Sequence, residues 1–229
     1  MKEQAQQLIY TMVHPLIRGM MTIGMTPNLV TTIGFAINIV AAGVFIIGGE
    51  LGVRGDFEYV GWGGGLILLA GLFDMLDGRL ARVSGQSSTY GALFDSVLDR
   101  YSELVMFLGI GWYLIAHDYL LSSFMAFLAL VGSMMVSYVR ARAEGLGLSC
   151  SVGLMQRPER IVLVGGSALI CGLVAPMFPP NLVVMEGVFA QPFRVDASIV
   201  LSLPLSVVAV LANYTAIVRL NHCRRLLEQ

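Results

Sequence analysis

Four carboxylates stand at regular intervals inside a largely apolar part of this sequence. Asp74 and Asp77 are three residues apart, and Asp95 and Asp99 are four apart, so each pair lies on one face of a helix. Carboxylates within apolar helices are costly and mark functional sites. When four of them converge they repel one another unless protons or cations bind, and hard oxygen ligands suit Mg²⁺, Mn²⁺ or Ca²⁺. Two divalent ions held in this way clamp phosphate oxygens, so the pattern predicts phosphoryl transfer.

Small and basic residues beside these carboxylates support the same chemistry. Gly78 follows one carboxylate and Gly91 precedes another by one helical turn, so both leave room where a ligand approaches. Arg82 lies one turn beyond Gly78 and suits a diphosphate. An alternative interpretation is a set of salt bridges with Arg79 and Arg82 that ties helix ends together. That alternative explains neither the excess of carboxylates nor the glycines.

Apolar helices must position these residues. Of 229 residues, 56% are hydrophobic and 13% are charged, which excludes an ordinary soluble domain and a disordered chain. A net charge of -1 argues against a nucleic-acid binder that works through a basic surface. We predict an all-α integral membrane protein with six transmembrane helices, since a bilayer core needs about 20 apolar residues per helix. The predicted spans are Leu29–Gly49, Val60–Leu80, Gly91–Ala116, Tyr119–Val139, Ile161–Met185 and Ala197–Val218.

The first residues predict a different kind of helix. Apolar residues recur at helical spacing in residues 1–25, which indicates an N-terminal amphipathic helix in the membrane interface, followed by a membrane domain over 26–229. Thr26 and Pro27 suit the N-cap and first turn of the first span. Asn28 and Thr31 share a face in that opening turn. Two interpretations stay open for them: local hydrogen bonding, or polar groups that face a cavity.

The basic residues predict the orientation of the chain. With the N-terminus in the cytoplasm, only Arg54 and Arg194 of the 14 Lys and Arg residues lie outside. This bias places both termini and the carboxylates at the cytoplasmic side. The short polar segment 83–89 makes the second and third spans antiparallel neighbours, so that all four carboxylates can meet.

The complete spacing D-x2-D-G-x2-A-R-x8-G-x3-D-x3-D identifies a family resemblance. It is met by Asp74, Asp77, Gly78, Ala81, Arg82, Gly91, Asp95 and Asp99. In this motif the chain resembles the CDP-alcohol phosphatidyltransferase family, whose members transfer a phosphatidyl group from a CDP-lipid to an alcohol and release CMP.

The resemblance implies roles for individual residues. Asp74, Asp77 and Asp95 would hold the metals, while Asp99 would reach one ion and also act as general base for the acceptor hydroxyl. The implied cofactor is Mg²⁺ or Mn²⁺, as two ions. The implied contacts of the CDP-lipid, here CDP-diacylglycerol, are Asn28, Thr31, Asp77, Gly78, Arg82 and Gly91. The resemblance also implies a homodimer in a bacterial or archaeal cytoplasmic membrane.

Basic residues at three further helix ends point to the acceptor. Positive charge beside the metals suits a phosphorylated polyol better than a neutral alcohol. The segments Y-x-R-A-R-A-E and R-P-E-R resemble the subgroup of the family that makes phosphatidylinositol phosphate from inositol phosphate. By that resemblance the residues that bind the acceptor phosphate are Arg140, Arg160 and Arg219.

Other interpretations remain. Arg142 and Arg157 are interpreted as ligands of lipid head groups or as partners of Glu144 and Glu159. Glu103 is expected to be the structural partner of a nearby arginine. Glycerol phosphate is the leading rival acceptor, as in phosphatidylglycerophosphate synthases. The basic residues can also serve only as topology anchors, and intramembrane carboxylates can line the path of a cation transporter.

Overall fold

The computed structural model describes residues 15–177, 182–184 and 193–228. Six long helices make up most of this part of the chain, and two strands of three residues pair as an antiparallel hairpin. The all-α prediction is therefore confirmed, with the hairpin as an addition. The elements are α2 (Pro27–Leu51), α3 (Glu58–Ser84), α4 (Thr89–Ala116), α5 (Leu120–Glu144), α6 (Arg157–Val174), the short 3₁₀ helix η1 (Ala175–Met177), β1 (Leu182–Val184), β2 (Phe193–Val195) and α7 (Ile199–Leu227).

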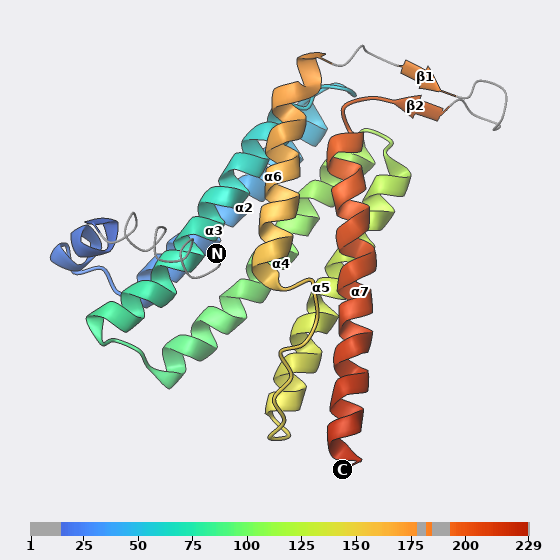
Figure 1. Ribbon diagram of the computed structural model, residues 1–229. Coiled ribbons are helices and arrows are strands. Elements are labelled where there is room, and N and C mark those ends of the chain that lie inside the picture. Colours follow the sequence, from blue (N-terminus) through green and yellow to red (C-terminus); the bar gives the residue numbers. More distant parts are fainter. Residues whose placement is uncertain (1–14, 178–181, 185–192, 229) are drawn as a thin grey trace.

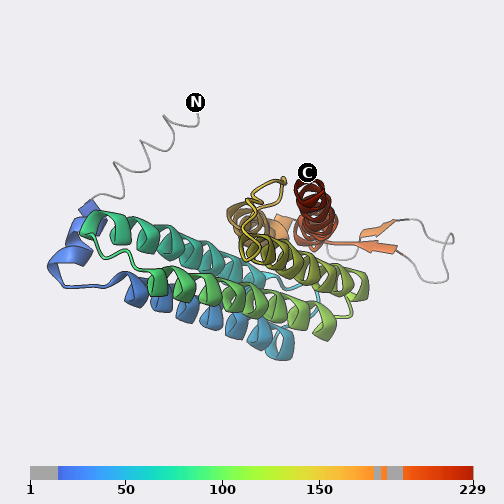
Figure 2. The ribbon, with the colours of Figure 1, turned by 90° about the horizontal axis from the view of Figure 1, so that it is seen from below.

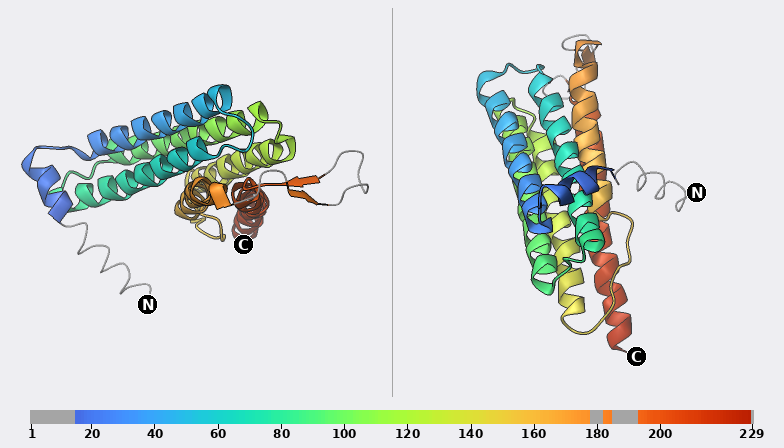
Figure 3. Two further views of the ribbon diagram at one scale, coloured as in Figure 1. Left: turned by 90° about the horizontal axis from the view of Figure 1, so that it is seen from above. Right: turned by 90° about the vertical axis from the view of Figure 1, so that its left-hand side faces the viewer.

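The six long helices pack as one bundle (Figure 1). Helix α2 packs on α3 and α4, α3 also packs on α6, α4 on α5, and α7 on both α5 and α6. These neighbours join the six helices in a closed ring. Figures 2 and 3 show the bundle from below, from above and from one side. The α3–α4 turn, the start of α2 and the end of α7 lie at one end of the bundle, and the β hairpin lies at the other (Figure 1).

Local signals in the sequence explain where two site helices begin. The Thr26 hydroxyl caps α2 by accepting a hydrogen bond from the Leu29 amide at 3.3 Å, and Pro27 opens the first turn. The Ser88 hydroxyl caps α4 in the same way, with the Gly91 amide at 2.9 Å. The expected helix start at Thr26–Pro27 is thereby confirmed.

Small residues let α3 and α6 approach closely. A β-carbon added to Gly61 would lie 3.0 Å from the Gly172 Cα. Contacts of this kind are typical of packed membrane helices. Near the start of α6, a β-carbon on Gly71 would lie 2.9 Å from the Ile161 Cγ2 atom, so this part of α6 also lies close to α3, the helix that carries Asp74 and Asp77.

Five helices of the described residues are long and apolar enough to cross a membrane, namely α2, α3, α5, α6 with η1, and α7. Helix α4 is not among them, because its first half carries Asp95, Asp99, Arg100 and Glu103. The predicted span Ile161–Met185 was wrong at its end. The α-helix stops at Val174, before Pro176, and Leu182–Val184 forms a strand.

The described residues include only part of the predicted N-terminal amphipathic helix. Residues 15–22 are helical, with Ile17 and Met20 buried and Leu16 and Met21 exposed. Residues 1–14 lie outside the described part of the chain.

Candidate active site

Three of the four motif carboxylates meet at the end of the bundle that holds the α3–α4 turn. Asp74 comes from α3, whereas Asp95 and Asp99 come from α4. One carboxylate oxygen from each lies within 4.8 Å of the others. All three side chains are partly buried. The structure thus brings together residues that are 25 positions apart, as the antiparallel arrangement of α3 and α4 requires.

Asp77 lies one helical turn beyond Asp74 and is 4% exposed. It is not part of the three-oxygen cluster, but it lines the small crevice that also contains Asp74 and Asp99. Its Oδ2 atom is buried and has no hydrogen-bond partner among the described residues, and the same holds for the Oδ1 atom of Asp95. Buried carboxylate oxygens of this kind are costly unless a cation or donor satisfies them. The oxygen donors and their spacing therefore fit a hard divalent cation.

One arginine contacts this cluster although the sequence predicted other partners for it. Arg157, at the first position of α6, places its Nη1 atom 2.6 Å from Asp74 Oδ1 and 2.8 Å from Asp99 Oδ1. The interpretation that pairs Arg157 with Glu159 was therefore wrong, whereas binding of lipid head groups stays a prediction. Two carboxylates within 3 Å attract the guanidinium more strongly than the single carboxylate of Glu159 would. Arg100 also pairs with Asp99, but at 3.6 Å.

A cavity of about 220 Å³ adjoins the carboxylates between α2, α3 and α4. It contains all six residues predicted to contact the CDP-lipid, and also Asp95. Those six residues are Asn28, Thr31, Asp77, Gly78, Arg82 and Gly91. The same cavity is lined by the polar α3–α4 turn, including Gln86, Ser87 and Ser88. A cavity that is lined in part by polar side chains and ends on a carboxylate cluster suits a nucleotide diphosphate whose phosphates lie near the metal.

The two motif glycines border this cavity for different reasons. A β-carbon on Gly91 would lie 3.0 Å from the Ser88 Oγ atom and 3.3 Å from the Asn28 Oδ1 atom, so a side chain there would crowd the cavity wall. A β-carbon on Gly78 would meet nothing within 4 Å, because it would point into open space. Both observations agree with the expectation that glycine leaves room for a ligand.

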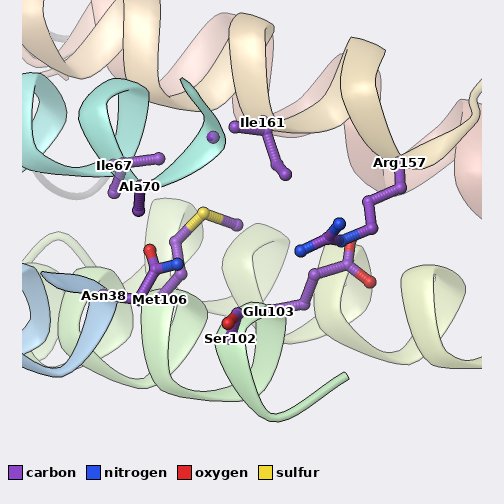
Figure 4. Close-up of a pocket in the computed structure, with 9 residues that line it drawn as sticks. Asn38, Ile67, Ala70, Ser102, Glu103, Met106, Arg157 and Ile161 are labelled. Atoms are coloured by element: carbon purple, nitrogen blue, oxygen red, sulfur yellow. The ribbon is translucent and has the colours of Figure 1, made fainter. Parts of the chain in front are cut away.

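A second, smaller cavity lies behind Arg157 (Figure 4). At about 10 Å³ it has the size of one water molecule, and it is lined by Asn38, Ser102, Glu103 and Met106 among others. Figure 4 shows the side chains of Arg157 and Glu103 extending toward each other across it. Polar groups thus continue from the carboxylate cluster into the bundle.

Glu103 forms a buried ion pair with Arg160. The Glu103 Oε1 atom accepts from Arg160 Nε at 2.8 Å and lies 2.6 Å from Arg160 Nη2, and the Nη1 atom donates to the Met155 carbonyl at 2.9 Å. The two side chains are 2% and 1% exposed. The prediction that Glu103 partners a nearby arginine is confirmed. The pair also fixes the first turn of α6 against α4.

Arg219 fixes the loop between α5 and α6. Its Nε donates to the Val152 carbonyl at 2.8 Å and its Nη1 to the Val136 carbonyl at 2.8 Å. In the same loop the Cys150 thiol donates to the Arg219 carbonyl at 3.6 Å, and burial raises the pKa of this thiol to about 11. The thiol is therefore protonated at neutral pH.

The third predicted acceptor residue is more accessible. Arg140, near the end of α5, is half exposed and donates from Nε to Glu144 at 2.8 Å. The prediction had given Glu144 to Arg142, which was wrong. Like charges on Arg140 and Arg160 act on the Arg219 guanidinium. The three arginines therefore lie within electrostatic range of one another.

Three polar residues at this site were not predicted from the sequence, namely Arg157, Asn38 and Ser102. Asn38 and Ser102 line both crevices beside Arg157. One signal could have identified Arg157. It stands three residues before Arg160, so both face the same side of α6, and an excess of carboxylates needs a cation. No comparable signal existed for Asn38 and Ser102, because single polar residues in apolar helices are common.

Comparisons with known proteins agree with the family resemblance of the sequence. The sequence profile of the family described as CDP-alcohol phosphatidyltransferase matches residues 24–208. The phosphatidylinositol phosphate synthase of Mycobacteroides abscessus is 34% identical over 168 residues, which are 72% of this chain and 72% of that protein. The crystal structure of Mycobacterium tuberculosis phosphatidylinositol phosphate synthase with manganese and citrate has a TM-score of 0.71, 29% identity, and covers 91% of this chain and 87% of that one. The structure of the same enzyme with CDP-DAG bound has a TM-score of 0.70, 29% identity, and covers 91% and 92%.

Proposed function

Because this chain belongs to the CDP-alcohol phosphatidyltransferase family, we propose that its cavity and carboxylate cluster form the active site of a phosphatidylinositol phosphate synthase. The enzyme transfers the phosphatidyl group of CDP-diacylglycerol to a hydroxyl of inositol phosphate and releases CMP. The observation that carries the site assignment is the convergence of six motif residues on one cavity that ends at the carboxylates.

Polar side chains of the α3–α4 turn line the donor cavity, together with the carboxylates of Asp77 and Asp95. We assign the cytidine diphosphate to the cavity between α2, α3 and α4, where Arg82 faces the diphosphate and Asn28 and Thr31 face the nucleotide. Gly78 and Gly91 leave the space for it. The glycerolipid part of the donor remains in the bilayer beside these helices, so one end of the bundle serves a lipid donor and a water-soluble acceptor together.

Divalent metal is part of this chemistry. A relative binds manganese, and the three-oxygen cluster offers hard ligands. We assign the metal to Asp74, Asp77, Asp95 and Asp99 as two ions, either Mg²⁺ or Mn²⁺. When bound, the metal neutralises the phosphoryl oxygens of the diphosphate.

Asp99 is the proposed general base. The acceptor hydroxyl attacks the phosphorus of the phosphatidyl group, the P–O bond to CMP breaks, and the hydroxyl proton passes to the Asp99 carboxylate. CMP leaves with the electrons of the broken bond. The protein supplies mainly charge neutralisation and positioning, as phosphoryl transfer requires, and general-base catalysis adds about 10²–10⁴-fold.

We propose that the positive region of Arg140, Arg160 and Arg219 receives the phosphate of the acceptor. In support, the three arginines stand at the same end of the bundle as the donor cavity. In the structure Arg160 and Arg219 already donate hydrogen bonds to protein groups. Acceptor binding at these two residues therefore exchanges some of those contacts for phosphate oxygens.

The membrane arrangement completes the proposal. We infer that α4 is the sixth transmembrane helix, because it runs beside α2 and α5 and is 28 residues long. The bias of Lys and Arg favours both termini and the active site on the cytoplasmic side of a bacterial or archaeal membrane. Residues 1–25 would lie along the interface before a membrane domain over 26–229. A homodimer with one complete site in each protomer is consistent with this arrangement.

An acceptor panel tests the proposal. Purified protein in detergent is given CDP-diacylglycerol and Mg²⁺, and CMP release is measured with inositol phosphate, glycerol phosphate, free inositol or serine. We expect CMP release only with inositol phosphate. Release only with glycerol phosphate would retain the reaction class and replace the acceptor, and no release with any acceptor would reject the enzyme assignment.

A further inference from the structure

Arg157 occupies an unusual position for a residue at the start of a membrane helix. Its guanidinium contacts two motif carboxylates, at 2.6 Å from Asp74 and 2.8 Å from Asp99. Its side chain is only 17% exposed. Contacts this short are charge-assisted hydrogen bonds, which are about twice as strong as neutral ones. The residue therefore belongs to the carboxylate cluster.

The fold sets this position. Three residues further along α6, Arg160 is held by Glu103 of α4 in a fully buried ion pair. Because the two arginines share one face of α6, the buried pair orients the helix so that Arg157 projects onto the carboxylates. The close contact of Gly61 with Gly172 holds the far end of α6 against α3.

A guanidinium and a divalent cation compete for this place. The oxygens that Arg157 contacts belong to the Asp74, Asp95 and Asp99 group whose members lie within 4.8 Å of one another. Without a cation these carboxylates repel one another. With both an arginine and a divalent ion among them, the two cations repel each other, and Arg157 and the metal would share the same oxygens.

We propose that Arg157 is a built-in counter-cation: it neutralises Asp74 and Asp99 in the metal-free protein and is displaced from them when a divalent cation binds. This inference rests on the proposed metal site. The displaced guanidinium remains beside the polar crevice of Asn38, Ser102 and Glu103, which it already lines (Figure 4). Arg157 is thus a positioning residue, which holds the carboxylates together before metal binds and sets the affinity for the metal.

A titration of the purified protein with Mn²⁺ in detergent tests the proposal. The EPR signal of free Mn²⁺ measures how much of the metal is bound. Arg157→Gln removes the competitor, so we expect Mn²⁺ to bind at least about tenfold more tightly, given two charge-assisted hydrogen bonds lost by the metal-free state. Arg157→Lys retains the charge without the fork of donors, so it should bind no more weakly than the wild type. Arg100→Gln is the matched control, because Arg100 also pairs with Asp99 but at 3.6 Å. It should change the affinity by less than about threefold, as expected for a weak partly exposed pair.

Thermal unfolding provides the second measurement. In excess chelator, Arg157→Gln should melt below the wild type, because its carboxylates lack a counter-cation. In saturating Mn²⁺ the difference should disappear. A deficit that is equal in chelator and Mn²⁺ would make Arg157 an ordinary structural residue and overturn the proposal.

The titration separates this proposal from the proposed metal site. Unchanged or weaker Mn²⁺ binding in Arg157→Gln would overturn the counter-cation role. If that variant does not fold, weaker binding in Arg157→Lys would do the same. Asp95→Asn tests the metal site itself, since Asp95 has no ion pair with Arg157 among the described contacts. Wild-type Mn²⁺ affinity in Asp95→Asn would reject the site on which this inference rests.

Discussion

Substitution of Arg160 separates its structural role from its proposed role in acceptor binding. Arg160→Met leaves the Glu103 carboxylate 2% exposed and without its cation, and also releases the Met155 carbonyl. Loss of one partner of a buried ion pair costs about 3–5 kcal/mol. For a protein of this size, we therefore expect the melting temperature in detergent to fall by about 6–20 °C.

A second variant removes both charges. In Glu103→Leu/Arg160→Met the pair is replaced by apolar side chains of similar volume, an exchange that is often neutral or stabilising. We expect the double variant to melt within a few degrees of the wild type. Glu103→Gln alone is the matched control for the carboxylate, because it retains a hydrogen-bond acceptor for the arginine.

Steady-state kinetics of the stable double variant, compared with those of Glu103→Gln, then measure the contribution of Arg160. If the guanidinium binds the acceptor phosphate, its loss should cost about 2–5 kcal/mol, so KM for inositol phosphate should rise at least about thirtyfold. Binding of CDP-diacylglycerol should be unchanged, because Arg160 does not line the donor cavity. A stable double variant with wild-type KM would refute the acceptor role. A single variant that melts like the wild type would refute the structural reasoning.

Three further predictions concern the donor site. Asp74→Asn should abolish CMP release while the protein remains folded, and excess chelator should do the same to the wild type; turnover in chelator would argue against metal use. Asp99→Asn should lose catalysis but retain CDP-diacylglycerol binding better than Asp74→Asn; equal loss of binding would make Asp99 mainly a metal ligand. Gly91→Val should weaken donor binding at least about tenfold, because its β-carbon would crowd Asn28. Gly111→Val on the same helix meets nothing within 4 Å and should bind the donor like the wild type in the same titration.

The donor site could be predicted from the sequence because its residues are close together along the chain. Asp74 to Asp99 span one helix end, one short turn and one helix start, so helical spacing alone determines which side chains share a face. The N-cap at Thr26 likewise determines where α2 begins, and so it predicts that Asn28 and Thr31 share a face near the start of that helix. These are local relations, and the cavity contains all six predicted donor residues.

Relations between distant helices could not be predicted in the same way. The contact of Arg157 with Asp74 joins positions 83 residues apart, and it depends on how α6 packs on α3. Arg219 reaches Val136 for the same kind of reason. Runs of apolar residues predict which part of a helix lies in the membrane, but they do not predict where the helix ends. Thus α7 continues to Leu227, well beyond the predicted end at Val218, because no residue there stops the helix.

A structure of the protein with Mn²⁺ and CDP-diacylglycerol tests the central claim most directly. The account predicts Mn²⁺ bound by Asp74, Asp95 and Asp99, the diphosphate beside Arg82, and the cytidine in the cavity between α2, α3 and α4. Cytidine bound elsewhere, for example in the groove between the ends of α5 and α7 near Tyr138, or Mn²⁺ away from the carboxylates, would contradict it.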